Sequence, residues 1–91
     1  MQRVYEYPLD LTDKQTIEVQ GKLISAIEQD GGIVVYALHD DDIEPTLCDV
    51  FIVGTGNSNY IELDNCHFLG SVKIKMFVFH VFCHGIWHRK C

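Results

Sequence analysis

The fold of this chain is decided by the stretch LISAIEQDGGIVVYAL, residues 23–38. Two apolar runs, 23–29 and 33–38, flank Asp30-Gly31-Gly32, and glycine supplies the positive φ angles that a tight hairpin turn needs. Runs of this length that are rich in Val, Ile and Tyr are typical of β-strands. The stretch therefore predicts a β-hairpin, and the neighbouring segments are interpreted outward from it.

Segments on either side of the hairpin add further strands. Alternation over residues 4–7 predicts an edge strand that ends at Pro8, because proline has no N–H to donate to a ladder. Apolar residues on both faces of 47–53, with Asp49 as the exception, predict a strand buried on much of both sides. Two more strands are expected at 67–72 and 77–83.

The segment 13–29 fits two structures. A capping box that begins at Thr12 and isoleucines at helical spacing favour a short helix within 13–29. Gly21 would lie in the middle of that helix at a cost of about 1 kcal/mol, and the apolar residues also fit the period of a strand. We expect strands here. The chain is then all-β, a small antiparallel sandwich or barrel of about seven strands.

The length of 91 residues leaves room for one domain, expected at 1–83, followed by a C-terminal tail at 84–91. The first residues lack the apolar segment of a signal peptide, and the longest apolar run, 76–83, is too short to span a bilayer. We therefore expect a soluble cytoplasmic protein that does not bind membranes. In that compartment the four cysteines are expected to be reduced and buried.

The formal net charge of −6 conceals a division along the chain. All thirteen acids and only three bases lie within residues 1–64, which carry −10, whereas residues 65–91 have four bases, no acid and four of the five histidines. Two interpretations stay open. The two parts neutralise each other in the fold, or the acidic part forms a surface for a basic partner.

Six short blocks follow one another in a characteristic order: YEYPL (5–9), TDKQTIE (12–18), YAL (36–38), GTG (54–56), FLGSV (68–72) and FHVF (79–82). Together they resemble a family of short, uncharacterised, β-rich proteins of bacteriophages and prophages. The resemblance covers residues 4–82 and implies a β-rich domain in a phage setting, and with it the cytoplasm of a bacterial host. No established activity of the family can be carried over to this chain. This chain departs from the family at Asn57, where members often have histidine, and its tail runs past the expected end.

The last twelve residues contain ligands that zinc prefers: His80, Cys83, His84, His88 and Cys91. Only His84 and His88 have the spacing of a structural site, and no second pair completes it. The acidic loop 40–44 lacks the glycine and the distal glutamate of a calcium loop. We therefore expect no metal and no cofactor.

The sequence also predicts no catalytic residues. Cys66 with His67, and Cys83 with His84, are adjacent pairs, and adjacent residues of a strand point to opposite faces. A nucleophile needs its base within hydrogen-bond reach, so these pairs do not form a catalytic site. We expect a protein that is not an enzyme, and the pI near 5.1 argues against direct binding to nucleic acid.

Three functions are compatible with these features. The first is a non-enzymatic phage accessory protein that binds and inhibits a host factor, for example one of an antiviral defence system, through Asp40, Asp41, Asp42 and Glu44. The second is a small-ligand module that sequesters a nucleotide signal, whose base would stack on Tyr5, Tyr7, Tyr36 or Trp87. The third is a structural virion component. A homo-oligomer is compatible with each of them.

Overall fold

The hairpin predicted at 23–38 is confirmed in the computed structural model, which describes residues 1–56 and 63–85. Strand β3 (Gly21–Gln29) pairs with β4 (Gly32–Asp40) through a turn in which Asp30 and Gly31 have φ angles of 55° and 81°. Strand β1 (Gln2–Leu9) pairs with the other side of β4. The three strands form an antiparallel sheet in the order β1-β4-β3.

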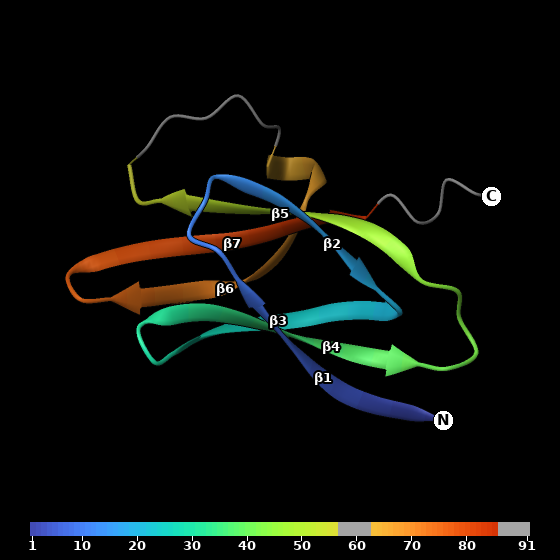
Figure 1. Ribbon diagram of the computed structural model, residues 1–91. Helices are drawn as coiled ribbons and strands as arrows, with labels where there is room; N and C mark the ends of the chain where they lie inside the picture. Colours follow the sequence, from blue (N-terminus) through green and yellow to red (C-terminus); the bar gives the residue numbers. More distant parts are fainter. Residues whose placement is uncertain (57–62, 86–91) are drawn as a thin grey trace.

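A second antiparallel sheet packs against the first (Figure 1). It has the order β2-β5-β7-β6, and a 3-10 turn, η1 (Leu63–Asn65), precedes β6. Its strands are β2 (Lys14–Val19), β5 (Thr46–Gly54), β6 (His67–Ile74) and β7 (Phe77–Gly85). The prediction of an all-β fold with about seven strands is confirmed. The structure contains, in the part that it describes, no helix with the length and apolarity needed to cross a membrane.

The short helix considered within 13–29 is wrong, because this segment is two strands that belong to different sheets. β2 ends at Val19 and pairs with β5, whereas β3 begins at Gly21 and pairs with β4. The chain changes sheet at Gln20, whose carbonyl accepts a hydrogen bond of 3.0 Å from the Asp40 N–H. Pairing with two separate strands satisfies the backbone along the segment, so tertiary contacts override the local helical signal.

The first strand does not end at Pro8, as the sequence predicts, but continues to Leu9. Pro8 stands opposite Val34 in the ladder between β1 and β4. β1 is an edge strand of its sheet. An edge strand tolerates proline because the N–H groups on its outer side have no partner to lose.

The core lies between the two sheets and is built by the inward faces of their strands. Leu23 and Ala26 of β3 both face it although they are three residues apart, because a bulge at Ile24 shifts the register. Gly70 of β6 lies so close to β3 that an added Cβ would be 3.1 Å from the Ala26 carbonyl oxygen. β3 and β6 therefore pack closely against each other across the interface between the two sheets.

Gly21→Ala should destabilise the protein far more than Gly31→Ala. Both glycines have positive φ, which costs an L-residue about 1 kcal/mol. A Cβ at Gly21 would also overlap the Leu38 carbonyl oxygen, whereas one at Gly31 meets nothing. We expect a loss on the order of 3 kcal/mol in the free energy of unfolding for Gly21→Ala. Urea denaturation measures both, and equal losses would contradict the close approach at Gly21.

Candidate functional site

A cavity of about 430 Å³ opens on the three-stranded sheet, at the end where β4 leads into the loop before β5. In β4, Ala37 and His39 are buried against the core, so Leu38 and Asp40 point to the opposite, outer face of the sheet. The cavity lies on that face. Its lining residues are Gln2, Gly21, Lys22, Leu38, Asp40, Ile43 and Thr46. Its volume falls within the range of ligand-binding pockets, roughly 300–1,000 Å³.

The walls of this cavity are mostly apolar. One apolar lining residue, Leu38, belongs to β4. The other, Ile43, belongs to the loop between β4 and β5, and 46% of its surface is exposed. Two of the lining side chains are charged, Asp40 and Lys22. A ligand that enters the cavity would therefore bury apolar surface beside a carboxylate and an amine.

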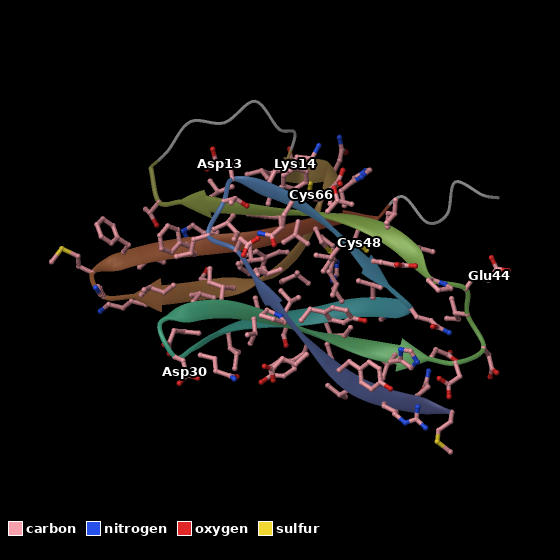
Figure 2. All side chains as sticks on the ribbon, in the orientation of Figure 1. Asp13, Lys14, Asp30, Glu44, Cys48 and Cys66 are labelled. Atoms are coloured by element: carbon pink, nitrogen blue, oxygen red, sulfur yellow. The ribbon has the colours of Figure 1, made fainter. Side chains whose placement is uncertain are left out.

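The four acidic residues predicted to bind a partner are brought together at this end of the molecule, but their contacts differ. They are Asp40, Asp41, Asp42 and Glu44. Within residues 1–56 and 63–85, no ion pair involves Asp42 or Glu44, and both are exposed. Figure 2 shows Glu44 at the end of the molecule opposite to Asp30. These two carboxylates are therefore accessible to a partner.

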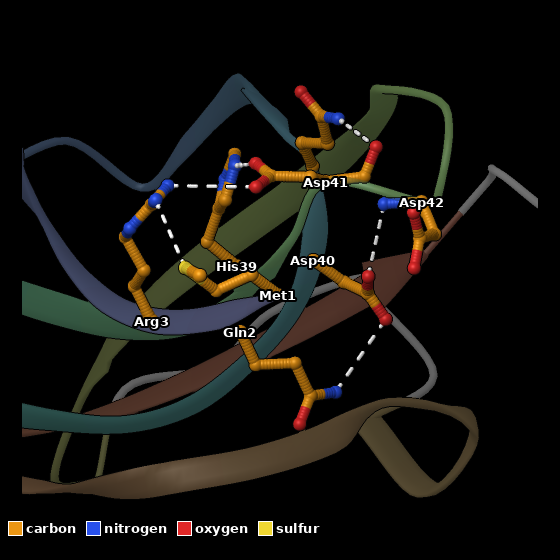
Figure 3. A network of polar contacts seen from close by, with 8 residues as sticks. Met1, Gln2, Arg3, His39, Asp40, Asp41 and Asp42 are labelled. Atoms are coloured by element: carbon orange, nitrogen blue, oxygen red, sulfur yellow. Dashed lines mark hydrogen bonds and ion pairs between the residues drawn. The ribbon is translucent and has the colours of Figure 1, made fainter.

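Asp41 is held by the N-terminal strand and by a buried histidine (Figure 3). One of its carboxylate oxygens lies 2.8 Å from His39 Nε2, and the other lies 3.5 Å from an Arg3 guanidinium nitrogen. The hydrogen bond with His39, and then the positive charge of Arg3, hold the pKa of Asp41 below its ordinary value. The His39 ring stacks on Tyr5 with a centroid distance of 4.4 Å. Asp41 therefore fixes the loop to β1 and β4.

The side chain of Asp40 forms hydrogen bonds that hold the same loop in place. Its carboxylate accepts a hydrogen bond of 3.0 Å from the Asp42 N–H and one of 3.4 Å from Gln2 Nε2. Figure 3 shows both contacts. Asp40 and Asp41 are thus positioning residues, and they place the side chains of Asp42 and Glu44 in solvent.

The aromatic residues predicted to stack on a ligand do not converge. Tyr5 and Tyr7 lie on the core-side face of β1, where Tyr7 is partly buried and burial raises its pKa. Tyr36 stands opposite Glu6 in the register and so lies on the other face of the sheet. None of these three tyrosines lines the cavity. Trp87 lies outside the described residues.

A chain of hydrogen bonds on the outer face of the four-stranded sheet was not predicted from the sequence. Ser71 Oγ and Thr55 Oγ1 each lie 2.8 Å from a ring nitrogen of His80, Nδ1 and Nε2 respectively. Thr55 Oγ1 also lies 3.3 Å from the Val78 carbonyl oxygen, to which its hydroxyl can donate.

This arrangement orders a hydroxyl, a base and an orienting group in the way that nucleophilic catalysis uses. None of Ser71, His80 and Thr55 lines the cavity at the β4–β5 end. These hydrogen bonds join β6, β7 and the turn after β5. Only the register, which places Ser71 opposite His80, could have revealed it.

The metal ligands weighed at the C-terminus are separated where they are described. Cys83 is buried in the core and the exposed His84 follows it on the opposite face of β7. No group of three potential ligands occurs in the parts of the chain that the structure describes. His88 and Cys91 lie outside those parts. The strand itself runs through Gly85, two residues past the expected end of the domain.

Cys48 and Cys83 are thiols in the core, with 2% and 5% of their surface exposed. Burial raises the pKa of Cys48 to about 11 and that of Cys83 to about 12. The thiolate is the reactive form, so both thiols should resist modification in the folded protein.

In a Cys66→Ser/Cys91→Ser variant, the two remaining thiols should react with a thiol reagent at pH 8 far more slowly in buffer than in concentrated urea. Mass spectrometry of the alkylated protein measures the modified fraction over time. A Cys48→Ser addition to this variant serves as the control, since it leaves Cys83 as the one site. Rapid labelling of both thiols without denaturant would contradict their burial.

Replacement of Asp41 should destabilise the protein at neutral pH and matter less in acid. A lowered pKa in the fold means that the carboxylate stabilises the fold fully above its ordinary value of 3.8. That contribution is lost as the pH falls through the lower, folded-state pKa. Thermal unfolding of Asp41→Asn and the unchanged protein should differ at pH 6 and converge only as the pH falls well below 3.8. Asp42→Asn is the matched control, and a difference that persists in acid would argue against the Asp41 contacts.

The sequence matches the model of one protein family over residues 1–87, a range that includes all seven strands described above. The match is longer than the stretch 4–82 over which the phage resemblance is expected, and it reaches into the segment 84–91. No curated protein and no solved structure matches the chain. Because the matching family covers nearly the whole sequence, the chain belongs to the family described as Domain of unknown function (DUF7352).

Proposed function

We propose that this protein binds another protein through the cavity and acidic loop at the β4–β5 end, and that it has no catalytic step of its own. One observation carries the proposal. An apolar cavity lined by Leu38 and Ile43 adjoins carboxylates, those of Asp42 and Glu44, that no described base neutralises.

This combination matches the general anatomy of protein interfaces. Their buried centre is apolar and their rim is polar and accessible to solvent. Complementary charge raises the association rate and excludes partners of like charge. The ligand that fits is a protein segment with one or two large apolar side chains flanked by Lys or Arg.

In the phage setting that the resemblance implies, the partner would be a factor of the bacterial host. A host protein with a basic, exposed segment, such as the nucleic-acid-binding face of an antiviral defence protein, has the matching chemistry. Occupation of that segment would inhibit the host factor by competition. The charge of −10 on residues 1–64 supports this choice.

Charge reversal at the accessible carboxylates tests the proposal without disturbing the loop. Asp42→Lys/Glu44→Lys should lose capture of host proteins from a bacterial lysate, because it reverses the charge that would attract a basic partner. Neither side chain forms an ion pair within the described residues, so the fold should be retained. Asp10→Lys/Asp13→Lys changes the charge equally in the β1–β2 connection, and Figure 2 shows Asp13 well away from Glu44. This control should retain capture.

The apolar wall is tested separately by Ile43→Ser. Leu11→Ser is its control, because Leu11 is similarly exposed, at 54% against 46%, in the β1–β2 connection. Quantitative mass spectrometry of the captured proteins compares all four variants with the unchanged protein. A partner that is retained equally by every variant, or no specific partner at all, would refute the proposed function.

A further inference from the structure

The tip of the β6–β7 hairpin combines exposed apolar side chains with lysines, which is the kind of segment proposed above as the ligand of the cavity. Ile74 and Phe77 face each other across the two-residue turn Lys75-Met76. Met76 and Phe77 are 81% and 60% exposed, although both are large and apolar. Lys73 and Lys75, which flank them, are exposed as well. Exposed apolar residues grouped in this way mark interaction sites rather than ordinary surface.

The tip also carries the opposite charge to the cavity. No acidic residue follows Asp64 in the sequence, so the hairpin contributes only positive charge. At the other site, Asp42 and Glu44 are accessible and Asp40 lines the wall, with the amine of Lys22 also in the lining. Charge and apolar surface are therefore complementary between the two sites.

The two sites lie at opposite ends of the molecule. β5 starts at Thr46, which lines the cavity, and ends at Gly54, which stands opposite Phe79 in β7. Nine residues of strand span about 30 Å, and the hairpin tip extends beyond that end. Figure 1 shows the tip and the β4–β5 loop on opposite sides of the view. A chain cannot insert its own tip into its own cavity.

We propose that the cavity binds the β6–β7 tip of a second copy of this chain, with Met76 and Phe77 against the apolar wall and Lys73 and Lys75 beside the carboxylates. This inference rests on the proposed function, because it uses the same cavity. A contact between different surfaces of two copies is heterologous, so it continues into a ring or an open chain of molecules. Self-association then covers the site of the outside partner, and the two compete.

A charge exchange between the two ends tests the inference. Lys73→Glu/Lys75→Glu has an acidic tip and an acidic loop, and Asp42→Lys/Glu44→Lys has a basic tip and a basic loop. Each variant alone should associate at least about tenfold more weakly than the unchanged protein, because like charges meet. An equimolar mixture should associate again, since each tip then meets a loop of opposite charge.

Sedimentation equilibrium over a range of protein concentrations measures the average mass of the associated species for each variant and for the mixture. The unchanged protein should show a mass that rises with concentration and falls with added salt. Phe77→Ser should weaken the association, and Asp10→Lys/Asp13→Lys should leave it unchanged. Circular dichroism of each variant establishes that it is folded.

The outcomes separate this inference from the proposed function. An unchanged protein that is monomeric at every concentration overturns the inference, as does association that survives both charge variants or a mixture that stays monomeric. Binding of the tip to vesicles of anionic lipid, with no self-association, also overturns it. Capture of a host partner that depends on Asp42 and Glu44 would leave the proposed function standing in each of these cases.

Discussion

The structure depends on one crossing, where the chain leaves the four-stranded sheet after Val19 and enters the three-stranded sheet at Gly21. The backbone of β4 lies so close to this point that no side chain fits at Gly21. The hydrogen bond from the Asp40 N–H to the Gln20 carbonyl fastens the crossing to the end of β4. One continuous segment thus contributes an edge strand to each sheet and holds the two sheets together. The same crossing provides one wall of the cavity, through Gly21 and Lys22.

How much of this fold can be predicted depends on whether a feature is local. The hairpin around Asp30-Gly31-Gly32 follows from its own sequence, because the turn glycines and the β-branched runs agree. Within the segment 13–29, β2 is not local in this sense, because its partner β5 lies far along the chain, whereas β3 belongs to the local hairpin with β4. The bulge at Ile24 hides the alternation that would have identified β3 as a strand with one buried face.

The candidate site shows the same limit. The run from Asp40 to Asp42 is evident in the sequence as a charged loop, but its division into positioning and accessible carboxylates is not. Asp41 differs from its neighbours because it contacts His39 and Arg3. His39 is a buried residue two positions earlier, and Arg3 lies far away in the sequence, on β1. The apolar cavity beside the loop is also absent from any linear pattern, because its walls come from four separate strands and a loop. Local composition identified the charged loop, and the three-dimensional contacts show which of its carboxylates are held and which are accessible.

Pro8 in β1 bears on how copies of this protein behave when they are concentrated. Exposed strand edges are templates on which further strands add, and this is the route to fibrous aggregation. β1 is an edge of its sheet, and a proline within it removes one donor from the row of backbone groups that an added strand would use. In the end-to-end association proposed above, this proline would discourage molecules from pairing along their strand edges, so that association would stay reversible.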